Sequence, residues 1–306
     1  MSEAALRERE RHRRELRAAV LAGERLIGVF LNMGSAVSAE LCAQAGYDWG
    51  LIDLEHGLGS EGPLLHELQA LELGGAAALV RVEAGTPLRL SRALDKGAAG
   101  VVVPRVRSAA EARQVIDWVR YPPDGSRGVA TSARAAGYGA LAHHRVREVN
   151  ETITTVIQIE NEQALAEVEA IAAVDGVDAL FVGPNDLTHA LAIPGRFDDA
   201  RYIESLEKVA AAAAAAGKAA GILLRGPAEL EWHAHLGYTL LAMGSDSGLL
   251  AKAAQGAVAS LREAGANEAA AAGHAPNTAS QALDAGGETA DAGGPRPTPA
   301  TKPQIL

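Results

Sequence analysis

Charged and amide side chains follow several short apolar runs of the sequence, and their types could support chemistry. A single acid after such a run is weak evidence, because acids in that position often cap the next helix. Several of them at the ends of neighbouring strands would instead meet at one rim of the fold, where they could form a site. The polar groups are Asp53-Leu54-Glu55-His56, Arg81, Gln158-Ile159-Glu160 and Gly183-Pro184-Asn185-Asp186.

Glu160 and Asp186 supply two carboxylates of this set, with no soft ligand beside them. The chain has a single cysteine, Cys42, and no pair of histidines follows an apolar run. Carboxylates without sulfur or imidazole ligands suit a hard divalent cation that keeps positions open for water and substrate. The sequence therefore predicts a magnesium, manganese or cobalt site rather than structural zinc.

The segments that must position these residues alternate between short apolar runs and longer helical patterns. Near-continuous apolar runs of this length are typical of strands that are buried on both faces, as in parallel sheets. The expected strands are Ile27–Leu31, Trp49–Asp53, Ala77–Val82, Gly100–Pro104, Ile153–Ile159, Val177–Val182, Ala219–Leu224 and Thr239–Met243. The expected helices are Ala36–Ala45, Pro63–Leu73, Pro87–Lys96, Ser108–Val119, Gln163–Ala173, Tyr202–Ala216, Pro227–Leu236 and Leu249–Glu263.

A strand followed each time by a helix predicts a closed (β/α)8 TIM barrel, with its chemistry at the carboxyl ends of the strands. The alternative is an open doubly wound sheet, whose first turn would bind a nucleotide through a GxGxxG sequence. The turn after the first strand reads Asn32-Met33-Gly34-Ser35, which lacks that sequence and favours the barrel. The connection from Arg120 to Thr152 has no clear pattern, and it is either a lid or a solvated insertion.

The chain is expected to consist of three parts. Residues 1–23 form an N-terminal helical extension, and residues 24–264 form the barrel. Residues 265–306 are rich in Ala, Gly and Pro without apolar periodicity. Such a stretch buries too little apolar surface to offset the conformational entropy lost on ordering, so we expect a disordered tail.

Acidic residues outnumber basic ones, which gives a formal net charge of −10 and argues against a nucleic-acid partner. No run approaches the roughly 18 consecutive apolar residues that a membrane span needs. The charged N-terminus does not match a signal peptide, and a single cysteine excludes an internal disulfide. We therefore expect a cytoplasmic protein with small-molecule partners and no membrane contact.

The polar groups appear in the order and spacing of a known family. The sequence resembles the class II pyruvate aldolases of the HpcH/HpaI family from about Arg25 to Gln255. The matching elements are Asp53-Leu54-Glu55-His56, Arg81, Arg120-Tyr121-Pro122-Pro123 with Arg127-Gly128, Gln158-Ile159-Glu160 and Gly183-Pro184-Asn185-Asp186-Leu187. The DxEH and GPxDL elements are specific when they occur together.

The resemblance implies a role for each residue of the candidate site. Glu160 and Asp186 would ligate the divalent metal, and Gln158 would line its site. Arg81 would face the keto oxygen of pyruvate, and His56 would take part in proton transfer.

Further positions follow from the same resemblance. The backbone of Gly183, Pro184 and Asn185 would bind the pyruvate carboxylate. Asp95, near the end of the third expected helix, matches an acid that reaches a neighbouring subunit's site in the family. The family typically forms homohexamers of dimers that exchange the last helix. Phe30 stands where close relatives often carry tryptophan, which leaves the aldehyde partner open.

The implied activity is that of a carbon–carbon lyase, which cleaves or forms 4-hydroxy-2-oxo acids from pyruvate and an aldehyde. A 2-oxo acid can chelate a metal through its carboxylate and keto oxygens, and the cation with Arg81 would stabilise the pyruvate enolate. A Schiff-base mechanism is disfavoured, because no lysine follows an expected strand, and such a lysine must reach the barrel mouth.

Three other functions stay open. An acyl-CoA lyase of the citrate lyase β-subunit type shares the barrel and the metal acids, and Arg105, Arg107 and Arg134 could contribute to its basic surface for CoA phosphates. A phosphate-handling isomerase or synthase could use Gly244-Ser245 before the last helix. A non-catalytic scaffold would bind no divalent metal.

Overall fold

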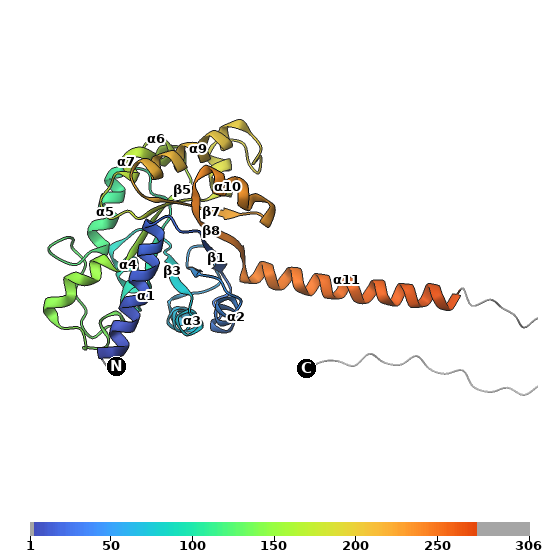
Figure 1. Ribbon diagram of the computed structural model, residues 1–306, viewed down its shortest axis with the longest axis horizontal. Coiled ribbons are helices and arrows are strands. Elements are labelled where there is room, and N and C mark those ends of the chain that lie inside the picture. Colours follow the sequence, from blue (N-terminus) through green and yellow to red (C-terminus); the bar gives the residue numbers. More distant parts are fainter. Residues whose placement is uncertain (1–2, 274–306) are drawn as a thin grey trace, which may run out of the picture. The chain divides into compact units, whose positions relative to one another are not determined.

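The computed structural model describes residues 3–273, and its strands form a closed barrel. The strands are parallel and pair in sequence order from β1 to β8, with β8 closing the ring against β1 (Figure 1). The predicted (β/α)8 fold is therefore confirmed. The strands are β1 (Leu26–Leu31), β2 (Trp49–Asp53), β3 (Ala77–Arg81), β4 (Gly100–Val103), β5 (Thr154–Ile159), β6 (Ala179–Val182), β7 (Ala219–Leu224) and β8 (Tyr238–Ser245).

The strand side chains form two apolar layers. The layer inside the barrel contains Phe30, Trp49 and Phe181, and the other layer packs against the surrounding helices. Leu16 and Val20 of α1 (Glu3–Leu21) belong to the inner layer, so this helix closes one end of the barrel. That end is the amino end of the strands, because Arg17 and Arg13 of α1 bind groups that precede β6 and β4. The carboxyl ends of the strands are not covered by this helix, so a site can form there.

Helices follow the strands as the sequence predicts, with some differences in their bounds. They are α2 (Ala36–Gln44), α3 (Glu61–Gly74), α4 (Pro87–Asp95), α5 (Ala109–Val119), α6 (Glu162–Ala166), α7 (Val168–Ala172), α8 (Pro184–Ala190), α9 (Ala200–Ala215) and α10 (Leu230–Leu236). The expected helix Gln163–Ala173 is interrupted at Glu167, whose carboxylate accepts a hydrogen bond from the backbone N–H of Ala109. Helix α8 was not expected, because its short polar sequence has no apolar periodicity.

The connection between α5 and β5 contains two 3-10 helices, η1 (Arg134–Ala136) and η2 (His143–Glu151). A third, η3 (Pro227–Glu229), precedes α10. These short turns lack the apolar periodicity that marks longer helices, which explains why the sequence does not reveal them.

The chain divides into two compact units, residues 1–255 and 256–306. The first contains the whole barrel. Helix α11 (Asp246–Gly273) begins in the first unit and continues into the second. The predicted boundary at Ala264 thus falls within a helix, because alanine-rich sequence favours helix even without an apolar face to bury. Residues 274–306, the rest of the predicted tail, lie outside the described residues.

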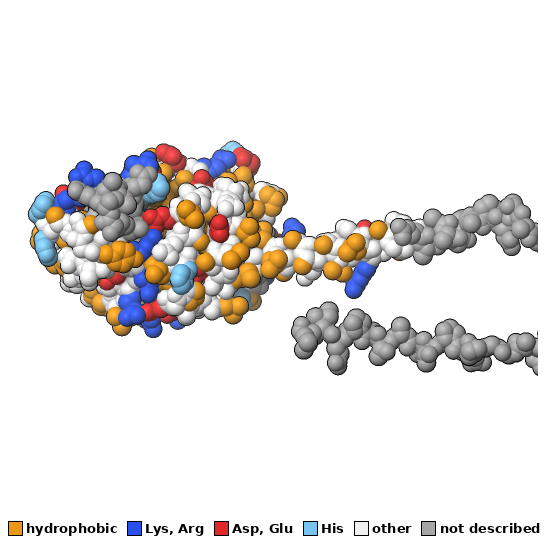
Figure 2. Space-filling model, turned by 90° about the horizontal axis from the view of Figure 1, so that it is seen from below, with side chains coloured by type: hydrophobic (Ala, Val, Ile, Leu, Met, Phe, Trp, Pro, Cys, Tyr) orange, Lys and Arg blue, Asp and Glu red, His pale blue; other side chains and the backbone are white. Residues whose placement is uncertain are grey.

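Acidic and basic side chains lie interspersed among apolar ones on the face of the first unit that Figure 2 shows. Among residues 3–273, no helix combines the length and the apolar character that crossing a membrane requires.

Candidate active site

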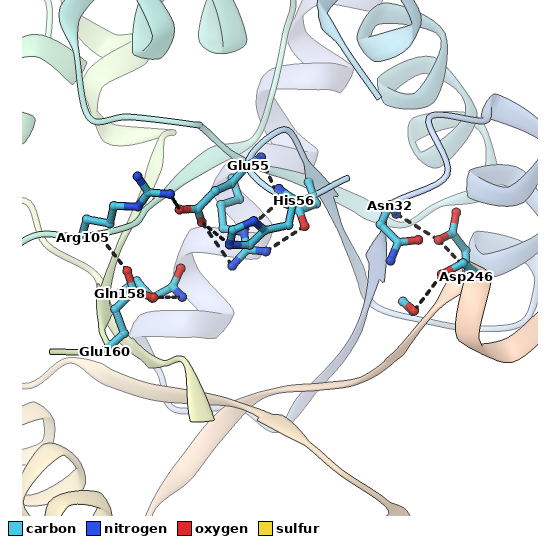
Figure 3. Close-up of polar contacts among 11 residues, drawn as sticks. Asn32, Glu55, His56, Arg105, Gln158, Glu160 and Asp246 are labelled. Atoms are coloured by element: carbon cyan, nitrogen blue, oxygen red, sulfur yellow. Dashed lines mark hydrogen bonds and ion pairs between the residues drawn. The ribbon is translucent and has the colours of Figure 1, made fainter. Parts of the chain in front are cut away.

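A cleft of about 380 Å³ opens beside the carboxyl ends of β2, β4, β5 and β6. The structure places His56, Glu160 and Asp186 in its wall, so three of the predicted site residues share one cavity. Figure 3 shows His56, Glu55 and Arg105 beside Glu160 and Gln158. The lining residues are Glu55, His56, Arg105, Arg107, Glu160, Asn161, Gln163 and Asp186.

Asp53 and Arg81, at the ends of β2 and β3, form a buried ion pair close to the cleft. The Nε and Nη2 atoms of Arg81 donate to the two carboxylate oxygens of Asp53 at 2.9 and 2.7 Å. Burial opposes the charge of Asp53, but the hydrogen bonds and charge of Arg81 outweigh it and lower the pKa of that carboxyl. The pair fixes the plane of the Arg81 guanidinium, which is buried and does not line the cleft.

Glu55 connects three basic side chains. Its Oε1 atom lies 2.7 Å from Nη2 of Arg105, and its Oε2 atom lies 3.4 Å from Nη1 of Arg81 and 3.8 Å from Nε2 of His56. The loop that carries Glu55 is fixed by Asp53, which accepts the backbone N–H groups of Glu55 and His56. The His56 side chain is itself 60% exposed, so it is accessible to a substrate in the cleft.

Glu160 follows β5, and it lines the cleft although most of its side chain is buried. Its Oε1 atom accepts the backbone N–H of Arg105 at 2.7 Å, and its Oε2 atom accepts the Gln158 amide. Burial raises the pKa of Glu160, and the negative charge of Asp186 raises it further. A positive charge between the two carboxylates would relieve this repulsion.

Gly183 provides the close approach that this arrangement needs. A side chain there would place its Cβ 2.7 Å from the Gln158 amide nitrogen and 3.1 Å from Oε2 of Glu160. Pro184, Asn185 and Asp186 continue from Gly183 into the first turn of α8, where Asn185 and Asp186 are exposed. The absence of a side chain at Gly183 therefore lets β6 and α8 pack directly against the buried acid.

Asp95 is not brought to this cleft within its own chain. It is the last residue of α4, a helix that runs back toward the amino ends of the strands. There it pairs with Nη2 of the buried Arg127 at 2.6 Å. A role in the site would require a second subunit, as the sequence resemblance implies.

The donor set suits a hard cation. Within residues 3–273 no three His, Cys, Asp or Glu side chains are placed to hold a metal, whereas Glu160 and Asp186 face one cavity with oxygen donors. Each Glu160 oxygen accepts one hydrogen bond from the protein, and a carboxylate oxygen has a second lone pair for a cation. The residues present thus fit a divalent cation with several open positions.

Some residues of the cleft were not predicted as part of the site. Arg105 directly follows Pro104, the last residue of the fourth expected strand, so the rule that identified the other strand ends could have found it. Asn161 and Gln163 follow Glu160 by one and three residues, and they resemble helix-capping residues in sequence.

A further polar cluster lies where β8 ends. Asp246 accepts the backbone N–H of Asn32 at 2.9 Å and the hydroxyl of Ser38 at 2.7 Å. It thereby joins the start of α11 to the loop after β1 (Figure 3). Asp246 lies next to Gly244-Ser245, so its buried carboxylate would repel a phosphate there. The hydroxyl of Ser245 accepts the backbone N–H of Gly248 and thus caps α11.

Comparisons with known proteins show to which family the chain belongs. The chain is 39% identical to a 2-keto-3-deoxy-L-rhamnonate aldolase of Klebsiella pneumoniae, over 76% of this chain and 88% of the relative. It is 37% identical to a hydroxypyruvate/pyruvate aldolase of Paraburkholderia phytofirmans, over 78% and 93%. The crystal structure of a Burkholderia cenocepacia family protein matches with a TM-score of 0.77 and 33% identity, over 81% and 99%. Residues 26–253 match the sequence model of the HpcH/HpaI aldolase/citrate lyase family, and the chain belongs to this family.

Proposed function

We propose that this protein is a divalent-metal-dependent aldolase. It would cleave 4-hydroxy-2-oxo acids into pyruvate and an aldehyde, or form them from these two compounds. The observation that carries the proposal is the cleft shared by Glu160, Asp186 and His56 above the Asp53–Arg81 pair. The names of the relatives, both pyruvate or 2-keto acid aldolases, support the same chemistry.

Glu160 and Asp186 would hold the cation, and Gln158 would orient Glu160 through its amide. A bound magnesium, manganese or cobalt ion would supply Lewis-acid chemistry, which stabilises negative charge on the keto oxygen of the 2-oxo acid. The backbone at Gly183, Pro184 and Asn185 would border the carboxylate.

Arg81 would add positive charge on the side of the keto oxygen. Burial opposes its charge, but Asp53 holds the pKa of Arg81 above its ordinary value, so the guanidinium stays cationic. During cleavage the C3–C4 bond breaks, its electron pair passes toward the keto group, and the C4 hydroxyl loses its proton as it becomes an aldehyde. His56 is the exposed base that would accept this proton, and C3 then takes up a proton to give pyruvate.

The acyl-CoA lyase alternative is weaker on this structure. Of the three arginines that it would use, Arg134 is buried and pairs with Glu72, away from the cleft. Arg107 is bound by Glu111. Cleavage of a CoA thioester instead of the free acid would decide for that alternative.

We further propose a homo-oligomer, the hexamer that the family resemblance implies, in which Asp95 approaches a neighbouring subunit's cleft. Its remoteness from the cleft of its own chain supports this arrangement. The cytoplasmic location and the absence of nucleic-acid or membrane partners stay predictions from the sequence.

The test is pyruvate release from 4-hydroxy-2-oxo acids after EDTA treatment, with and without added Mg²⁺, Mn²⁺ or Co²⁺. Glu160→Gln and Asp186→Asn should each abolish metal-dependent release and weaken Mn²⁺ binding in calorimetry, with unchanged circular dichroism. Glu162→Gln is the matched control, because this neighbouring carboxylate is exposed and does not line the cleft. If both site variants bind Mn²⁺ with the affinity of wild type, Glu160 and Asp186 are not the metal ligands.

A further inference from the structure

The cleft is lined by polar and charged residues. None of its lining residues, all of which are in the described part of the chain, is apolar. A charged or hydroxylated aldehyde would find hydrogen-bonding groups there for its polar atoms. The lining therefore favours a polar partner for pyruvate.

Arg105 extends into this cleft from an unusual backbone conformation. Its φ of 60° lies in the left-handed region, which a residue with a side chain adopts only when its surroundings hold it there. Here the backbone N–H of Arg105 donates to Oε1 of Glu160 at 2.7 Å. The hydrogen bond places the arginine directly beside the acid that would hold the metal.

The Arg105 guanidinium is only partly used within the protein. Nη2 lies 2.7 Å from Oε1 of Glu55, yet the side chain is 68% exposed. A guanidinium carries several N–H donors in a fork that matches a carboxylate. One edge of Arg105 can stay on Glu55 while another receives an anionic group from the cleft.

Arg107, two residues further on, is 64% exposed but is held by more hydrogen bonds. Its Nε and Nη2 atoms donate to Oε1 of Glu111 at 3.0 and 2.7 Å, and its backbone N–H donates to Oε2 of the same residue. Both arginines line the cleft, but Glu111 holds Arg107 through two guanidinium nitrogens and its backbone, whereas Glu55 holds Arg105 through Nη2. This difference makes Arg107 a matched control for Arg105.

We propose that Arg105 binds an anionic group, of the carboxylate class, on the aldehyde partner, and that it thereby selects carboxylated aldehydes over neutral ones. The inference rests on the proposed aldolase function and names the substrate class of the same cleft. Arg105 would act on the reactant that lies beyond pyruvate, because its backbone adjoins Glu160 while its guanidinium points into the cleft.

The experiment compares addition of pyruvate to matched aldehydes that differ in charge: succinic semialdehyde against butanal, and glyoxylate against glycolaldehyde. Wild type should prefer the carboxylated member of at least one pair. Arg105→Gln should lower kcat/KM for that aldehyde by about 10- to 100-fold, the usual effect of losing a charged hydrogen bond. The neutral aldehyde should change within about threefold, as should both aldehydes in Arg107→Gln, as expected of a side chain without a direct contact.

Exchange of the pyruvate C3 protons in D₂O, followed by NMR, separates this inference from the function on which it rests. Exchange that persists in Arg105→Gln, with loss of the charge preference, supports the inference. Normal exchange in the wild type with no preference in either pair, or an equal loss for charged and neutral aldehydes in Arg105→Gln, overturns the inference alone. A wild type that neither exchanges these protons nor adds pyruvate overturns both.

Discussion

Glu67, on α3, has a carboxyl group that is fully buried, and neither of its oxygens has a hydrogen-bond partner in the described part of the chain. Burial, and secondly the negative charge of Asp246, raise its pKa from 4.5 to about 7. The folded protein therefore keeps this proton at a pH where the unfolded chain has lost it. The protonated Glu67 carboxyl therefore makes its full contribution to the free energy of unfolding below pH 4.5, and this contribution is lost as the pH rises through 7.

The size of the effect follows from the two pKa values. Each pKa unit corresponds to about 1.4 kcal/mol, so a rise from 4.5 to about 7 makes ionisation of Glu67 in the folded state cost about 3 kcal/mol. Glu67→Gln keeps the shape of the side chain and removes the ionisation. Its free energy of unfolding, relative to wild type, should rise by about 2 to 3 kcal/mol between pH 5 and pH 8.5.

Urea-induced unfolding of both proteins at a series of pH values measures this difference, at one fixed protein concentration because assembly would add to stability. Glu204→Gln, an exposed carboxyl on α9, is the control, and its profile should run parallel to that of wild type. Parallel profiles for Glu67→Gln as well would refute the reasoning, since Glu67 would then ionise equally easily in the folded and unfolded chains.

Three shorter predictions concern other parts of the fold and the site. Arg17→Ala should lower the free energy of unfolding by about 3 to 5 kcal/mol, because Arg17 binds both oxygens of the buried Asp178. Adding Asp178→Asn should restore part of this stability, and no restoration would mean that the unpaired charge of Asp178 is not the cause of the loss. Asp53→Asn should lower kcat at least about 10-fold with unchanged Mn²⁺ affinity, since it releases Arg81; an unchanged kcat would contradict the role of the pair. EDTA should inactivate the enzyme reversibly, and borohydride with pyruvate should leave no mass adduct; an adduct on lysine would replace the metal mechanism.

The strands could be predicted from the sequence because both of their faces are buried. Trp49–Asp53 is apolar up to its last residue, and every one of its side chains is buried, so the run has clear ends. Helix α8 could not be predicted in the same way. Its seven residues show no apolar stripe. The helix depends instead on Gly183, which lets the chain pass close to Glu160, and on the proline in its first turn.

The site shows the same division between local and long-range information. His56, Glu160 and Asp186 each follow a buried strand, so closure of the barrel is enough to bring them to one rim. The contacts of Arg105 depend on a left-handed backbone angle that the sequence does not reveal. The effect of Asp246 on Glu67 likewise depends on how α3 packs near the start of α11, two segments far apart along the chain.

Glu55 lines the cleft but is paired with arginines, which leaves two acids for the cation that we propose. Glu55 lines the same cavity as Glu160 and Asp186, and its carboxylate alone would be an equally hard ligand. Arg105 and Arg81 hold both of its oxygens, so its charge is already compensated. A cation between Glu160 and Asp186 would therefore keep open positions, and a 2-oxo acid has the two oxygens needed to occupy two of them. In the proposed function, the two arginines would therefore leave room for substrate at the metal by keeping Glu55 paired.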